Sequence, residues 1–185
     1  ATVCRTATDN LDIIPANIDL SAAEVQLVNE VARESALARV LRHVEADYDV
    51  ILIDCQPSLG LLAVNALTAA HGVIVPVEAE FFALRGVALL VETIETVRDR
   101  INPRLKIDGI VATMVDSRTL HSREVLQRLQ EAFGDLVFDT RIGRTIKFPD
   151  ASVATEPILS YAPNHAGAHA YRRLAREVIA RGDAA

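Results

Sequence analysis

The stretch YDVILIDCQPS, residues 48–58, runs four uninterrupted apolar residues into an aspartate and then into a proline-containing turn. An unbroken run of β-branched and leucine side chains is typical of a strand that is buried on both faces of a parallel sheet. Asp54 follows this run, at the strand end where open α/β folds bind their ligands. In phosphoryl-transfer proteins such an aspartate holds magnesium beside a nucleotide. The alternative interpretation is that Asp54 only ends a strand and caps the next turn.

Strands and helices alternate along the rest of the chain. Apolar runs predict further strands at residues 11–14, 73–77, 109–115 and 137–140. Helical periodicity predicts helices within residues 17–30, 37–44, 59–70, 87–101, 125–133 and 171–178. Residues 141–163 read as a polar, basic loop. This alternation predicts an α/β fold, a doubly wound and mostly parallel sheet flanked by helices. No linker or repeat divides the chain, so we expect a single domain over residues 1–185.

The composition limits the possible classes of function. With 185 residues, half of them apolar, the chain is long enough for one sizeable core. Its 19 basic and 25 acidic residues give a net charge of −6, which argues against nucleic-acid binding by bulk charge but permits a local basic patch. Cys4 and Cys55 have no metal-binding spacing, and we expect reduced thiols. No apolar run approaches the roughly 20 residues that span a bilayer, so we expect a cytoplasmic protein without membrane contact.

Six segments resemble, in the same order, successive blocks of the ParA/Soj chromosome- and plasmid-partitioning ATPases. This family belongs to the deviant-Walker branch of the P-loop NTPases. The segment YDVILIDCQPSLGLLAVNALT at residues 48–68 resembles its second nucleotide motif. The other matching segments are residues 11–28, 73–98, 108–126, 133–142 and 170–179. The resemblance covers nearly the whole chain and implies a P-loop NTPase-like fold.

Two family motifs are absent from this sequence. The family opens with a glycine-rich Walker A loop, whose backbone amides cradle phosphates and whose hydroxyl binds magnesium. The eight glycines here are scattered singly, and the acidic motif that follows the loop in the family is also absent. The chain therefore resembles the C-terminal two-thirds of a ParA-like protein, incomplete at the N-terminus. We expect no ATP hydrolysis from these 185 residues alone, and we expect apolar surface left uncovered by the absent first strand.

The resemblance implies a nucleotide site for ATP or ADP with Mg²⁺ in the intact protein. Asp54 matches the Walker B aspartate, which orients magnesium through a bound water. Thr113, Met114 and Asp116 match the strand end that contacts the base, although a methionine is often only a core residue. Gly143 stands where relatives carry a proline beside the adenine, so stacking against that ring is lost.

The resemblance also implies a DNA-binding face. Arg118 lies in DSRT, similar to the family's DART segment, and Lys147 lies in GRTIKF, where relatives carry an arginine. Arg144 lies in the same segment as Lys147. Basic residues at these positions would bind DNA without sequence preference, by neutralising phosphates and releasing counterions. The alternative is that they are ordinary solvated surface charges.

The function implied by the resemblance is that of a partitioning ATPase. ATP would join two copies into a homodimer, the dimer would bind nucleoid DNA nonspecifically, and a ParB-like partner would stimulate hydrolysis. One alternative is a catalytically inactive ParA-like interaction module. Another is a division-site regulator similar to MinD, but the last predicted helix and the tail RGDAA lack a membrane-seeking apolar face.

Overall fold

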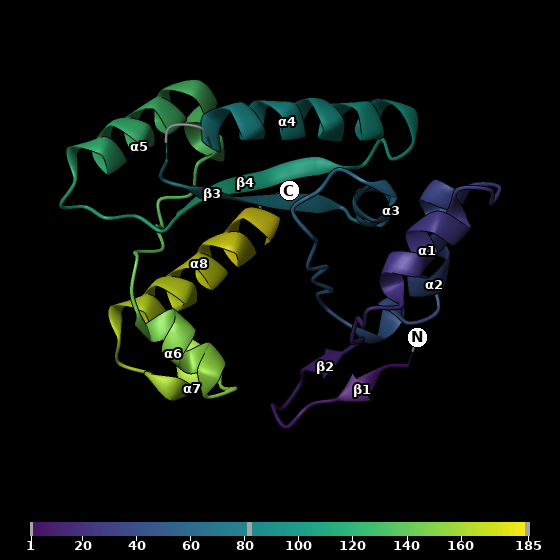
Figure 1. The fold of residues 1–185 in the computed structure, drawn as a ribbon, viewed down its shortest axis with the longest axis horizontal. Helices are drawn as coiled ribbons and strands as arrows, with labels where there is room; N and C mark the ends of the chain where they lie inside the picture. The colour runs from purple at the N-terminus through teal and green to yellow at the C-terminus, as the bar shows by residue number, and fades with distance from the viewer. Residues whose placement is uncertain (1, 81–82, 184–185) are drawn as a thin grey trace. The chain divides into compact units, whose positions relative to one another are not determined.

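The computed structural model describes residues 2–80 and 83–183, and the chain separates into two compact units, Ala1–Ala69 and Ala70–Ala185 (Figure 1). In the first unit two short strands pair as an antiparallel hairpin, β1 (Cys4–Arg5) with β2 (Asp12–Ile13). The hairpin is followed by α1 (Leu20–Leu27), η1 (Arg33–Ser35), α2 (Ala36–Leu41), η2 (Glu45–Asp47) and α3 (Leu61–Ala69).

The buried amide of Asn65 joins three helical elements of the first unit. Its Nδ2 donates to the carbonyl oxygens of Arg33 and Leu61, both at 2.9 Å. Its Oδ1 accepts from the backbone N–H of Leu37 at 3.1 Å. A buried amide that satisfies its donors and its acceptor in this way ties η1 and α2 to α3.

The strand predicted at residues 50–53 is not formed. Residues 50–56 belong to neither of the two described sheets, and their apolar side chains are largely exposed, with Leu52 at 84%. The prediction was wrong because an apolar run becomes a strand only where neighbouring strands accept and donate its backbone hydrogen bonds. Asp54 therefore follows an unpaired segment, and Cys55 beside it is exposed.

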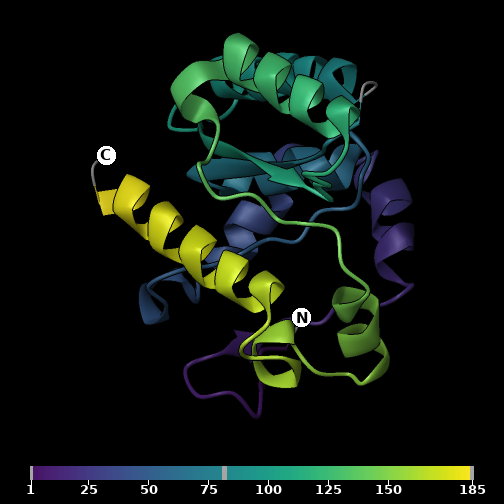
Figure 2. The same ribbon diagram turned by 90° about the vertical axis from the view of Figure 1, so that its left-hand side faces the viewer.

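The second unit is built around two parallel strands. Its elements are β3 (Gly72–Glu78), α4 (Ala83–Arg100), β4 (Lys106–Thr113), α5 (Leu120–Phe133), η3 (Gly134–Leu136), α6 (Lys147–Val153), α7 (Ile158–Tyr161) and α8 (Ala166–Asp183). β3 and β4 pair in parallel from Gly72–Lys106 to Glu78–Thr113. Helices α4 and α5 cover one face of this sheet and α8 covers the other (Figures 1 and 2). The expected parallel sheet flanked by helices is confirmed.

Apolar side chains form a core between the sheet and α8. Val111, Phe138, Ile142 and Ala170 are buried together in this cluster. Half-buried apolar side chains complete it, namely Ile74, Phe148, Leu174 and Val178. The burial follows the predicted patterns, because β4 alternates its side chains between two covered faces and α8 repeats at helical spacing.

Two predictions for the segment after α5 need correction. Residues 141–163 are not only a loop, since α6 and α7 form within them. The Phe148 ring of α6 packs edge-to-face on the Tyr171 ring, with their centroids 5.7 Å apart. This tertiary contact stabilises a short helix that the polar local sequence does not predict. Residues 137–140 do not form a regular strand, and they contribute one isolated parallel bridge, between Ile110 and Val137.

Candidate functional site

The carboxyl end of β4 and the segment 142–144 form one site in the second unit. A parallel bridge joins Val115 to Gly143. The Val115 N–H donates to the Ile142 carbonyl at 3.1 Å, and the Arg144 N–H donates to the Val115 carbonyl at 3.0 Å. These bonds bring Asp116 beside Gly143 and Arg144, at the sheet edge where α/β folds bind ligands. We refer to Thr113–Asp116 with Ile142–Arg144 as the strand-end site.

Met114 directly follows β4 and has an unusual backbone conformation. Its φ is 54°, in the left-handed region, which costs a residue with a Cβ about 1–2 kcal/mol. Its side chain is 40% exposed, so Met114 is not a core residue. The preceding Thr113 is half-buried, and its carbonyl accepts from the Ala79 N–H at 3.1 Å. Backbone strain of this kind is concentrated at ligand sites. The exposed, polarizable thioether of Met114 lies at this strand end.

Asp116 is held in a tight turn by Arg118. The Arg118 guanidinium donates Nε–H to one carboxylate oxygen at 2.9 Å and Nη2–H to the other at 2.7 Å, and its backbone N–H adds a bond at 3.1 Å. These side-chain and backbone hydrogen bonds, with the charges of Arg118 and Arg144, lower the pKa of the Asp116 carboxyl to about 2. Asp116 is therefore a carboxylate at neutral pH, with lone pairs left to accept a further hydrogen bond.

The three predicted DNA-binding residues all lie in the second unit. The Arg118 side chain is 87% exposed, and Arg144 is an exposed residue of the strand-end site. Lys147, at the start of α6, donates to Asp150 at 3.2 Å and lies 5.9 Å from the Tyr161 ring centroid. Arg118 and Lys147 thus each have an internal carboxylate partner that a phosphate would have to displace or share.

Asp54 lies in the first unit and is exposed, after the unpaired residues 50–53. A carboxylate in this position is open to solvent and to a cation. Within residues 2–80 and 83–183, no group of three His, Cys, Asp or Glu side chains is arranged to hold a metal ion. The proposed magnesium would therefore need oxygen ligands beyond Asp54, from water or from phosphates.

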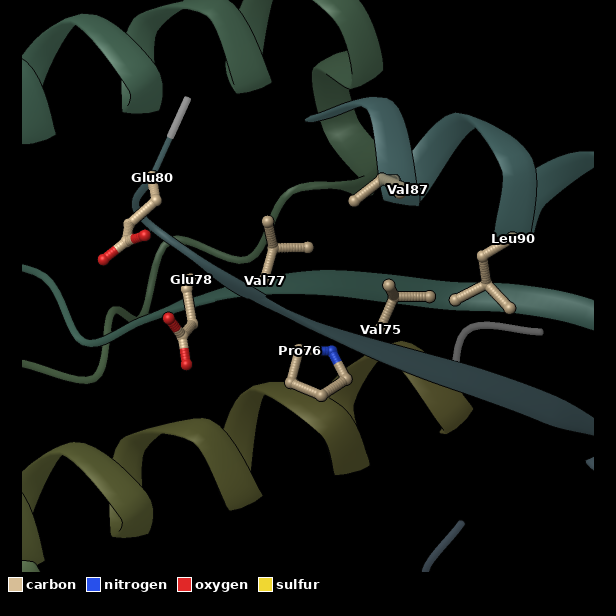
Figure 3. Close-up of a pocket in the computed structure, with 8 residues that line it drawn as sticks. Val75, Pro76, Val77, Glu78, Glu80, Val87 and Leu90 are labelled. Carbon is tan, nitrogen blue, oxygen red and sulfur yellow. The ribbon is translucent and has the colours of Figure 1, made fainter. Parts of the chain in front are cut away.

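Sequence reasoning missed two carboxylates at the end of β3. Glu78 is the last residue of β3 and Glu80 lies two residues beyond it, so the strand-end rule would have identified both. They line an open depression of about 390 Å³ between β3 and α4 (Figure 3). The other lining residues are Val75, Pro76, Val77, Gly86, Val87 and Leu90. The lining residues in the described part of the chain include two carboxylates and no basic side chain.

None of the helices that the structure describes is both long and apolar enough to cross a bilayer.

The sequence of this chain is similar to known proteins over most of its length. Residues 1–107 match the family model described as an AAA domain. The chain is 63% identical over 172 residues to an uncharacterized protein of Mycobacterium tuberculosis, covering 93% of this chain and 54% of that protein. It is 47% identical over 176 residues to the chromosome-partitioning ATPase Soj of Treponema pallidum, covering 95% of this chain and 70% of Soj. The chain thus spans about half the length of the mycobacterial relative.

A solved structure with a similar fold is that of a cobyrinic acid a,c-diamide synthase from Mycobacterium smegmatis. It has a TM-score of 0.77 and 41% identity, and the match covers 92% of this chain and 62% of that one. The same synthase with bound ADP and magnesium has a TM-score of 0.71 and 40% identity, covering 88% of this chain and 67% of that one.

Proposed function

The chain belongs to the ParA/Soj family of P-loop ATPases, and we propose that the protein containing it is an ATPase of chromosome or plasmid partitioning. The observation that carries the proposal is the 47% identity to Soj across 95% of this chain and 70% of Soj. Similarity of that extent spans both the first unit with Asp54 and the second unit with the strand-end site.

The strand-end site would contact the nucleotide base and ribose of ATP or ADP. Its exposed groups suit this role, since the Asp116 carboxylate can accept hydrogen bonds from an amine or a hydroxyl and the Met114 thioether can lie against a ring. Gly143 adds open space, because a Cβ built there would meet only the Val115 carbonyl, at 3.7 Å. Thr113 would border the same ligand through its half-buried side chain.

Magnesium would be oriented by Asp54 through a bound water. Bound magnesium would neutralise charge on the phosphates during hydrolysis. The glycines of this sequence are scattered singly and form no glycine-rich loop whose backbone amides could bind those phosphates. In this proposal a Walker A loop outside these residues binds them.

DNA would bind through Arg118, Arg144 and Lys147 on the second unit. The protein is acidic overall, so binding would depend on this local group rather than on net charge. ATP-dependent homodimerisation would double the number of phosphate contacts. A ParB-like partner would stimulate hydrolysis and release DNA, and the protein would be cytoplasmic and associated with the nucleoid.

The test uses the natural protein that contains these residues, with duplex DNA fragments of unrelated sequence. We expect DNA retention that requires ATP and magnesium, shows no preference among the fragments and falls steeply with salt. ATP turnover should increase when DNA and the ParB-like partner are both present. Absence of both turnover and ATP-dependent DNA binding would overturn the proposal and favour the inactive interaction module.

A second candidate function follows from the 41% identity to the cobyrinic acid a,c-diamide synthase structure. The protein would then use its nucleotide site to make the a,c-diamide of cobyrinic acid. Stimulation of ATP turnover by cobyrinic acid, with no effect of DNA, would favour this function over partitioning. Stimulation by DNA alone would exclude it.

A further inference from the structure

The segment 136–144 runs beside β4 with an interrupted register. The Phe138 N–H donates to the Ile110 carbonyl at 2.8 Å, and the next bond to β4 is from the Ile142 N–H to the Ala112 carbonyl at 2.9 Å. Between these two hydrogen bonds the segment advances by four residues, while β4 advances by two. In a regular parallel ladder both strands advance by two, so the segment contains a bulge with two extra residues.

A carboxylate from α8 satisfies the backbone of this bulge. In a regular ladder the Thr140 N–H would donate to the Ala112 carbonyl. It donates instead to Glu177 Oε2 at 3.0 Å, and the Asp139 N–H donates to Glu177 Oε1 at 2.7 Å. Thr140 is buried, so the Glu177 carboxylate gives its N–H an acceptor in place of water.

One turn later on α8, Arg181 holds the residues that precede the bulge. Its guanidinium pairs with the Glu177 carboxylate at 3.5 Å and lies 4.0 Å from the Phe138 ring centroid. It donates to three backbone carbonyls at 3.0–3.2 Å, those of Asp108, Leu136 and Val137. Arg181 therefore holds the residues just before the bulge, and Glu177 binds amides within it.

The bulge decides which residues lie beside Asp116. Side chains alternate with a period of two, so a slip by two residues would keep the same set of side chains facing the core. Apolar packing alone therefore discriminates poorly between the bulged and the regular register. The acceptor that favours the bulged register is the Glu177 carboxylate.

We propose that Glu177 is a positioning residue of the strand-end site, because its carboxylate holds the two-residue bulge that places Gly143 and Arg144 beside Asp116. The effect on nucleotide binding rests on the proposed function. The register itself rests only on the hydrogen bonds described above.

The experiment compares Glu177→Ala and Glu177→Gln with Glu124→Ala and Glu124→Gln in the natural protein. Glu124 is an exposed residue of α5 and controls for the loss of charge. Amide hydrogen exchange should show that protection at Asp139 and Thr140 is lost in Glu177→Ala and unchanged in both Glu124 variants. The dissociation constant for ATP with magnesium should rise about tenfold in that variant, equivalent to about 1.4 kcal/mol. Glu177→Gln keeps the side-chain length and one acceptor oxygen, so its amide protection and its dissociation constant should lie between those of wild type and Glu177→Ala. This variant serves as the test if Glu177→Ala does not fold.

Two results would overturn the inference. One is unchanged protection of the two bulge amides in the Glu177 variants. The other is lost protection with wild-type nucleotide affinity, which would mean that Glu177 stabilises the fold without positioning the site. Failure of the wild-type protein to bind ATP would instead overturn the proposed function, and amide exchange would still decide the register.

Discussion

Truncation of Phe138 to alanine is expected to destabilise the second unit by about 4 kcal/mol. The Phe138 side chain is 2% exposed and packs with Val111, Ile142 and Ala170. Its ring also lies against the Arg181 guanidinium, at 4.0 Å from the centroid. The same residue donates the first hydrogen bond from the segment 136–144 to β4.

The magnitude follows from three contributions. Burial of the ring contributes about 1.5–3 kcal/mol. The cavity left by truncation raises the cost of a Phe→Ala change to about 3–5 kcal/mol, because β4 is backbone-paired and cannot collapse into the space. Loss of the Arg181 cation–π contact adds about 0.5–1 kcal/mol at a partly exposed site. With a urea m-value of about 2 kcal/mol per molar, a loss of 4 kcal/mol lowers the unfolding midpoint by about 2 M.

Urea unfolding followed by circular dichroism measures this shift. Phe138→Leu keeps most of the volume and should cost only about 1 kcal/mol. Val153→Ala is the matched control on α6, where the side chain is 87% exposed, and it should change stability by less than about 0.5 kcal/mol. A Phe138→Ala midpoint within about 0.5 M of wild type would refute the assignment of this cluster as the core that holds the segment to β4.

Three further predictions address the charged residues. Arg118→Ala combined with Lys147→Ala should weaken DNA binding equally across sequences and reduce the salt slope by about 1.8, and an unchanged slope in a binding titration would remove both residues from the DNA face. Asp54→Ala should abolish ATP turnover while leaving the circular dichroism spectrum unchanged, and normal turnover would exclude its role at magnesium. Burial raises the pKa of the Glu177 carboxyl, but hydrogen bonds from the bulge and the charge of Arg181 outweigh it, so the net pKa is lowered. The folded state then binds this proton more weakly than the unfolded state, and the stabilisation present at pH 7 is lost as the pH falls below about 4.5. Unfolding midpoints measured from pH 7 to 3 should fall more for wild type than for Glu177→Gln. Parallel profiles would contradict the lowered pKa of Glu177.

The elements that could be predicted are those in which local pattern and tertiary setting agree. The apolar runs at 73–77 and 109–115 became β3 and β4 because each lies beside the other and is covered by helices. The periodic residues at 87–101 and 171–178 became parts of α4 and α8 for the same reason. The run at 50–53 has the same local pattern, but it lacks a strand partner and is not a strand.

The candidate site, like the fold, could be predicted from the sequence only in part. The family resemblance identified Asp116, and the rule that ligands bind at strand ends would have identified Glu78 and Glu80. The pairing of the Asp116 carboxylate with Arg118 depends on a turn geometry that residue types do not specify. The bulge opposite β4 was also missed, because residues 137–140 look like a strand and nothing near them indicates an acceptor.

The sequence by itself determined the α/β class, the ParA/Soj family and the identity of the strand-end residues, because each of these depends on local pattern or on ordered motifs. Only the tertiary structure decided which apolar runs are paired and which register the segment 136–144 adopts. That register depends on Glu177, 37 residues beyond Thr140 in the chain. The physical reason is that strand pairing and bulge formation are settled by hydrogen-bond partners distant in sequence, and composition and periodicity do not encode their positions.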